Sequence, residues 1–128
     1  MELRRPGPYS ALPQRTGDTT GLTFCRGTQV TAGDGVVDFL TIYPGWYRTR
    51  TPHLHVRVSL GNAEVLTSQL YFDDEVTAQV FAAEPYLSHT GRDTFNESDH
   101  MFDPSTLVAL SPEAEGHLAL LNVGIRRA

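Results

Sequence analysis

The sequence predicts an all-β fold, an antiparallel β-sandwich with long loops and one short helix. Stretches rich in β-branched and aromatic residues recur along the chain, Gly-containing turns separate several of them, and a single stretch has helical spacing. The chain has 128 residues, of which 40% are hydrophobic, and this fits one domain with a modest core. We therefore expect residues 1–128 to form a single domain.

Two β-hairpins are expected in the first half of the chain. Residues 1–22 contain Pro and Gly throughout and have no helical or strand period, so they are predicted to be loop. The first hairpin is predicted over residues 23–42, around the turn sequence AGDG. The second is predicted over residues 53–72, where Gly61 and the following Asn tolerate the positive φ of a tight turn.

The second half is predicted to contain one helix, a long loop and a last strand. Residues 73–83 have apolar side chains at helical spacing behind acidic residues, which is compatible with one short helix. Residues 85–104 are polar and interrupted by Gly and Pro, so they are predicted to be loop. Residues 116–126 return to a strand pattern.

The composition excludes several classes of protein. Cys25 is the only cysteine, so a disulfide framework and a CxxC zinc site are excluded, and Cys25 is most simply a small core residue. A formal net charge of -5 argues against nucleic acid as a partner. The chain has neither an apolar run near the roughly 20 residues of a membrane span nor a signal peptide. We expect a cytoplasmic protein with no membrane partner.

His53 and His55 lie two residues apart in a predicted strand. This spacing places both imidazoles on one face, where they can reach a single metal ion. An isolated HxH pair more often marks the solvated edge of a half-buried strand. Here the preceding segment YPGWYRTRTP adds Tyr43, Tyr47 and Arg50 around a Pro-Gly turn, a far rarer combination. The sequence therefore predicts a metal site.

Tyrosine next to the histidines favours iron(III). A phenolate is a hard anionic donor that prefers a hard, highly charged ion. Such an ion can remove the phenol proton despite a free pKa of about 10. A site for iron(II) or zinc stays open as an alternative, because the loop carboxylate of Asp93 or Asp99 could join the two histidines.

The stretch TFCRGTQVTAGDGVVDFLTIYPGWYRTRTPHLHVRV, residues 23–58, resembles the intradiol ring-cleavage dioxygenases. The stretches TSQLYFDDEVTAQVF, RDTFNESD and GHLALLNVGI continue the resemblance to the end of the chain. In that family a non-haem iron(III) is held by two tyrosinates and two histidines. The resemblance implies that the four ligands here are Tyr9 in GPYS, Tyr47, His53 and His55.

The resemblance also implies roles for neighbouring residues. Arg50 corresponds to the active-site arginine of the family and Gln69 to a glutamine near the substrate. Tyr43 is expected to pack in the core, although it is the substitute ligand if Tyr47 is not one. Thr49 stands where the family usually has Gly, and Thr restricts a position at which Gly would allow positive φ.

The function implied by the resemblance is cleavage of a catechol-type ring between its two hydroxyls with O2, which gives a cis,cis-muconate-type diacid. The partners would be a small aromatic diol and O2. In the implied mechanism Tyr47 leaves the iron and takes up a substrate proton, and Arg50 stabilises negative charge that develops on the ring.

Two other readings stay open. One is a β-sandwich module that binds carbohydrate or another ligand on an aromatic platform, for which the candidates are Tyr43, Trp46, Tyr47 and Tyr71. The other is a truncated, inactive remnant, because family members normally have further strands before the first tyrosine. Missing strands would leave an unpaired edge or an apolar face, so we expect a homodimer or a marginally stable monomer.

Overall fold

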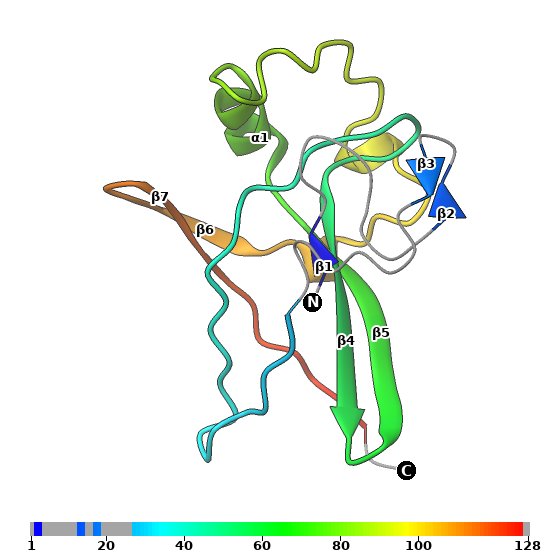
Figure 1. Ribbon diagram of the computed structural model, residues 1–128. Coiled ribbons are helices and arrows are strands. Elements are labelled where there is room, and N and C mark those ends of the chain that lie inside the picture. Colours follow the sequence, from blue (N-terminus) through cyan, green and yellow to red (C-terminus); the bar gives the residue numbers. More distant parts are fainter. Residues whose placement is uncertain (1, 4–12, 15–16, 19–26, 127–128) are drawn as a thin grey trace.

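The computed structural model describes residues 2–3, 13–14, 17–18 and 27–126. Among these residues the elements are mostly antiparallel strands with one α-helix, so the predicted all-β, sandwich-like class is confirmed (Figure 1). The strands are β1 (Glu2–Leu3), β2 (Pro13–Gln14), β3 (Gly17–Asp18), β4 (His53–Leu60), β5 (Ala63–Tyr71), β6 (Ala109–Glu113) and β7 (Gly116–Leu120). The helices are α1 (Asp74–Phe81) and two short 3-10 helices, η1 (Asn96–Ser98) and η2 (Pro104–Thr106).

Strands β4 and β5 form the long antiparallel ribbon that was predicted over residues 53–72. Gly61 has φ 59° in the turn between them, a conformation that glycine adopts without steric cost. The register pairs His53 with Tyr71 and His55 with Gln69. This pairing brings the start of β4 and the end of β5 to the same end of the molecule.

The N-terminal segment departs from the loop prediction, because β1, β2 and β3 lie within it. Strand β1 pairs with β4 and places Glu2 opposite His55, and β2 pairs with β3. Each of these strands has only two residues, so none is long enough to produce an alternating pattern in the sequence.

The prediction of a first hairpin over residues 23–42 is wrong for residues 27–42, the part that the structure describes. From residue 27 onward only the turn forms, where the amide of Gly35 donates to the carbonyl of Ala32 at 2.9 Å. The arms are linked through the side chain of Gln29, whose Oε1 accepts from the amide of Asp38 at 3.2 Å. Strands do not form here because the side chains are not buried: Leu40 and most of its neighbours are exposed. A high strand propensity stabilises a sheet only when such side chains pack against other residues.

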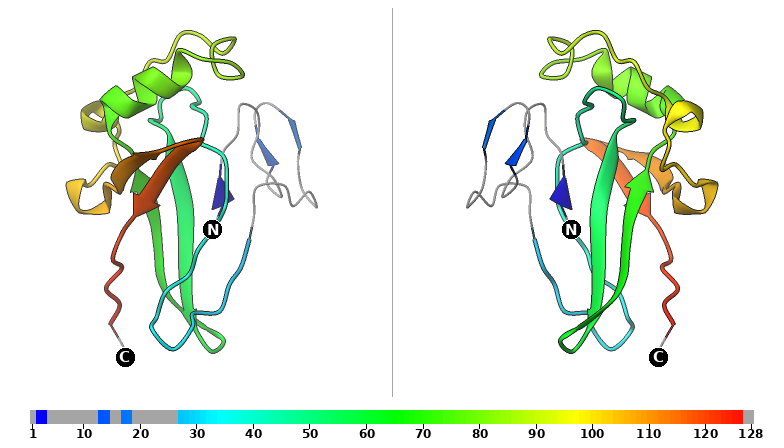
Figure 2. Two further views of the ribbon diagram at one scale, coloured as in Figure 1. Left: turned by 90° about the vertical axis from the view of Figure 1, so that its left-hand side faces the viewer. Right: turned by 90° about the vertical axis from the view of Figure 1, so that its right-hand side faces the viewer.

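The C-terminal part forms a second hairpin of β6 and β7. The predicted last strand ends early, at Leu120, and its partner β6 was missed because its sequence ALSPE has a proline and no apolar alternation. Figure 2 shows this hairpin crossing the β4–β5 ribbon in both views. A parallel bridge between Tyr71 and Leu107 connects the two parts.

Helix α1 agrees with the predicted helix at residues 73–83. It begins after Asp73, whose carboxylate accepts from the amides of Glu75 and Val76 at 2.9 and 3.2 Å. Figure 1 shows α1 at the end of the molecule where β4 begins and β5 ends. No helix within the described ranges is both long enough and apolar enough to cross a bilayer.

The core lies between the ribbon, α1 and the C-terminal hairpin. Its buried centre consists of Leu54, Phe72 and Val108. The partly buried side chains packed against this centre are Tyr43, Leu70, Leu110 and Leu121. Leu54 faces this core, so the two histidines on either side of it face the opposite side of the ribbon.

Candidate metal and catalytic site

Two imidazoles and a phenol meet at the start of β4. The Nε2 atoms of His53 and His55 are 3.2 Å apart, and their rings are stacked with centroids separated by 5.1 Å. The hydroxyl oxygen of Tyr47 lies 3.4 Å from Nε2 of His53. The two histidines therefore share one face, as their spacing predicted, and the Tyr47 oxygen lies on that face.

The turn before β4 delivers Tyr47 and Arg50 to this site. Pro44 and Trp46 are buried, and the indole nitrogen of Trp46 donates to the carbonyl of His89 at 2.9 Å, which anchors the turn. The amide of Arg50 then donates to the carbonyl of Tyr47 at 3.1 Å. This closes a tight reversal of the chain, so the two side chains lie near each other.

Thr49 occupies the left-handed region inside that reversal, with φ 71°. A threonine restricts this position, and the conformation is adopted nonetheless. The Thr49 amide donates to Oδ1 of Asp93 at 3.1 Å, and Arg48 lies 3.6 Å from the same carboxylate. Contacts with Asp93 therefore hold a conformation that costs a non-glycine residue about 1 kcal/mol or more.

His53 is held in the form that binds metals. Its Nδ1 lies 2.8 Å from the carbonyl oxygen of Thr51, which can only accept, so Nδ1 bears the proton and the lone pair is on Nε2. Burial lowers the pKa of His53 to about 3, against an opposing contribution from the bond to Thr51. At neutral pH the imidazole is therefore uncharged.

Arg50 is buried at the centre of a polar network. Its Nε donates to Oδ2 of Asp99 at 2.9 Å, and its Nη1 lies 3.4 Å from the hydroxyl oxygen of Tyr47. Its Nη2 donates to Oε1 of Gln69 and lies 3.4 Å from the hydroxyl oxygen of Tyr71. The guanidinium thus contacts residues from the turn, from β5 and from the loop after α1.

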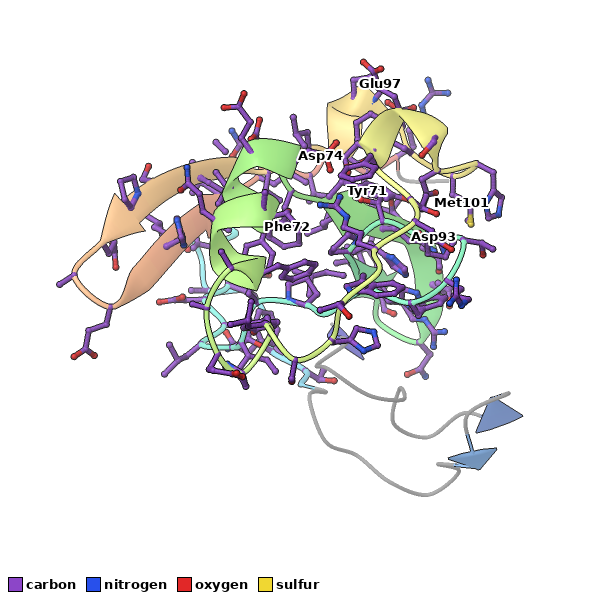
Figure 3. All side chains as sticks on the ribbon, turned by 90° about the horizontal axis from the view of Figure 1, so that it is seen from above. Tyr71, Phe72, Asp74, Asp93, Glu97 and Met101 are labelled. Atoms are coloured by element: carbon purple, nitrogen blue, oxygen red, sulfur yellow. The ribbon has the colours of Figure 1, made fainter. Side chains whose placement is uncertain are left out.

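Gln69 and Tyr71 complete the network on β5. Oε1 of Gln69 accepts from Arg50 and also from the hydroxyl of Tyr71 at 2.8 Å, which fixes the orientation of the amide. Nε2 of Gln69 then faces Sδ of Met101 at 3.8 Å. Figure 3 shows Tyr71 next to Met101, whose carbonyl lies 3.0 Å from the Tyr71 hydroxyl. One amide hydrogen of Gln69 is therefore directed toward Met101.

The loop that supplies Asp99 is itself anchored to the core. The side-chain amide of Asn96 donates to the carbonyl of Phe72 at 2.7 Å and accepts from the hydroxyl of Thr51 at 2.9 Å. Arg92 lies over the ring of Phe95 at 4.3 Å and forms an ion pair with Asp74 of α1. These contacts hold the loop against the residues that precede β4.

Tyr9 and Tyr43 were the remaining candidate tyrosines. Tyr9 lies outside the described residues, as does Cys25. Tyr43 packs in the core as predicted, against the rings of Phe72 and Phe81, and its hydroxyl oxygen is 2.6 Å from Oγ1 of Thr77. Burial raises the pKa of Tyr43 to about 12, which disfavours the phenolate that a metal would need.

The structure contradicts two of the alternatives left open by the sequence. Within the described ranges, no three or more His, Cys, Asp and Glu side chains are grouped to hold a metal ion, so neither Asp93 nor Asp99 joins the histidine pair. The aromatic platform is also wrong, because Trp46 and Tyr71 are buried. A carbohydrate stacks on exposed ring faces, and these two rings have none.

The sequence did not indicate that Asp99, Thr51 and Tyr71 belong to the network around Arg50. Asp99 was considered only as a metal ligand, and it is 49 residues from Arg50 in the chain. No local spacing indicates a contact over that distance. The stretch RDTFNESD was noted only as part of the family resemblance, and this was the one signal that the loop belongs to the site.

Solved structures similar to this chain include three dioxygenases. An intradiol ring-cleavage dioxygenase from Tetranychus urticae has 29% identity and a TM-score of 0.77, over 88% of this chain and 58% of its own. A second dioxygenase has 28% identity and a TM-score of 0.85, over 97% and 67%. The third is the dioxygenase domain of a fusion with a carbohydrate-binding protein from Streptomyces sp. SirexAA-E, with 30% identity and a TM-score of 0.62, over 92% and 60%.

The class of protein follows from these comparisons: the chain has a dioxygenase-like fold. The predicted resemblance to the intradiol ring-cleavage dioxygenases is confirmed. The chain spans 58 to 67% of the length of these three structures. No protein-family model and no curated protein matches the chain.

Proposed function

We propose that this protein is a non-haem iron(III) dioxygenase that cleaves a catechol-type ring between its two hydroxyls. The observation that supports this most is that the Tyr47 hydroxyl and Nε2 of His55 both lie close to Nε2 of His53, with Arg50 in contact with Tyr47. The similarity to dioxygenases in fold supports the same activity. The substrates would be a small aromatic diol and O2.

The donor atoms fit an iron ion. Ligands bound at about 2.0–2.1 Å in perpendicular directions are about 3 Å apart, and the atoms here are separated by 3.2 and 3.4 Å. The lone pair of His53 is available at Nε2 because Nδ1 donates to Thr51. We propose Tyr47, His53 and His55 as ligands, with Tyr9 as the fourth. Iron(III) bound there would withdraw electron density from a chelated catecholate and make its ring reactive toward O2.

The protein side chains would supply the remaining chemistry. Tyr47, as a phenolate, would accept one of the two hydroxyl protons that a catechol must lose on binding. Arg50 lies 3.4 Å from the Tyr47 oxygen, so its charge is placed to stabilise negative charge that develops on the ring oxygens. The second amide hydrogen of Gln69, whose amide is oriented by Arg50 and Tyr71, would donate to a substrate oxygen.

Metal content and colour test the ligand set directly. Protein loaded with iron in air should hold one iron per chain and absorb in the visible range through tyrosinate-to-iron charge transfer. Tyr47→Phe should remove or shift this band, and His53→Ala or His55→Ala should lower the iron content. His117→Ala is the matched control, because His117 is an exposed residue of β7. Colourless protein with one iron per chain would refute the tyrosinate ligands, and full iron content in both histidine variants would refute the site.

The product of the reaction tests the position of cleavage. Oxygen insertion between the two hydroxyl-bearing carbons of catechol or hydroxyquinol gives a colourless muconate-type diacid. Insertion beside them gives a yellow semialdehyde. We expect the diacid, with oxygen from labelled O2 in the new carboxyl groups, and formation of the semialdehyde would refute the proposed reaction. Absence of turnover by fully loaded protein would favour an inactive remnant of the fold.

A further inference from the structure

We propose that Asp99 is the positioning residue of this site, the group that fixes the guanidinium of Arg50 over the metal ligands. The inference rests on the proposed function for its catalytic consequence, and it adds a residue to which the family resemblance assigned no role. It is carried by the contacts of a single buried carboxylate.

The Asp99 carboxylate is completely buried, and its bonds tie its own loop to the segment that precedes β4. Oδ2 accepts from Nε of Arg50 at 2.9 Å and from the amide of Thr51 at 2.8 Å. Oδ1 accepts from the amide of Met101 at 2.8 Å. The side chain of Asp99 has 0% relative exposure and that of Arg50 has 8%, so water does not compete for these bonds.

The bond to Nε determines where the rest of the guanidinium points. The group is planar, so fixing the Nε–H bond also fixes the plane of the guanidinium and with it the directions of the N–H bonds of Nη1 and Nη2. In this orientation Nη1 meets the oxygen of Tyr47 and Nη2 meets Oε1 of Gln69. Without Asp99, a flexible arginine side chain would sample several rotamers, and the charge would move away from the ligands.

The Asp99 carboxylate also favours the charged form of Arg50, against the opposing effect of burial. Burial opposes the charged form of Asp99, but the bonds from Met101, Arg50 and Thr51 outweigh it and hold the pKa of that carboxyl below its usual range. The pair is therefore ionised at neutral pH. Arg50 then acts through its oriented N–H groups, which is the form of catalysis that depends most on geometry.

The positioning itself can be measured on the metal-free protein. In NMR spectra of protein with nitrogen-15 in the arginine side chains, the Nε–H signal of Arg50 should be resolved and should exchange slowly with solvent. The signal of Arg50 is identified as the one that is missing from the spectrum of the Arg50→Lys variant. In Asp99→Asn the signal should exchange faster by at least about tenfold. The matched control is Glu64→Gln, because Glu64 also pairs with an arginine, Arg57 of β4, and makes no contact with the Asp99 loop. This control variant should leave the exchange rate of the Arg50 Nε–H signal unchanged.

The kinetics of the iron-loaded protein test whether the position of Arg50 affects catalysis. Asp99→Asn should keep the iron content and the visible band, lower kcat by about 10- to 100-fold and leave KM nearly unchanged, because a charge is misplaced while the ligands are intact. In an Arg50→Gln background the same change should have no further effect on kcat. An equal loss in both backgrounds would show a merely structural role and overturn the proposal.

The two proposals fail in different ways. A wild-type protein whose Arg50 Nε–H exchanges as fast as that of an exposed arginine overturns the role of Asp99, whether or not the variants fold. A protected Arg50 signal that Asp99→Asn releases supports that role. If the wild-type protein shows this protection but does not bind iron or turn over a catechol, the proposed function fails and the structural positioning stands.

Discussion

The hydroxyl pair of Tyr43 and Thr77 gives a test that separates a core tyrosine from a ligand tyrosine. The two oxygens are 2.6 Å apart, and Thr77 is completely buried. Tyr43→Phe leaves the Thr77 hydroxyl without this partner, and Thr77→Val does the same to Tyr43. Each single change should lower the free energy of unfolding by about 1–3 kcal/mol, since a buried polar group then lacks its hydrogen bond.

The double variant should cost less than the sum of the two single changes. Replacing both hydroxyls with apolar groups of similar shape removes the unsatisfied group, so the coupling energy should be about 1 kcal/mol or more. Urea denaturation of the metal-free protein measures all four members of the cycle. The iron-loaded Tyr43→Phe protein should keep its visible band, whereas Tyr47→Phe should lose or shift it with little change in stability. Additive losses would refute the hydrogen bond, and bleaching by Tyr43→Phe would make Tyr43 the ligand.

Two further predictions concern stability. Thr49→Gly should raise the free energy of unfolding by up to about 1 kcal/mol, because glycine adopts φ 71° without strain, while Thr67→Gly, in strand β5, should lower it. A higher denaturation midpoint for Thr67→Gly than for Thr49→Gly would contradict this account. The pKa of Asp99 is lowered in the folded state, so its contribution is complete above the unfolded value of about 3.9 and is lost as the pH falls below it. Asp99→Asn should flatten the acid limb of a stability-versus-pH curve, and an unchanged limb would refute the assignment.

Local pattern was sufficient for the elements that pack along their whole length. The hairpin at residues 53–72 and the helix at 73–83 were predicted within two residues of their observed limits. Alternation and helical spacing succeed there because one face of each element is in contact with the core. The same reasoning failed for residues 27–42, whose strand-like composition has no packed face in the structure.

The sequence by itself determined that the two histidines share one face of a strand. Strand geometry places His53 and His55 on one face wherever the strand lies, and the Pro-Gly turn before them brings Tyr47 and Arg50 close in the chain. The resemblance to a dioxygenase family depended on this compact segment. These features are local, so they need no knowledge of the rest of the fold.

Only the tertiary structure decided which groups surround that segment. It buried Tyr43 against α1, placed Tyr47 at the histidines and brought Asp99 to Arg50 across 49 residues. Hydrogen bonds in a buried network depend on where separate segments meet, and that meeting is set by packing of the whole core and not by any spacing within one element.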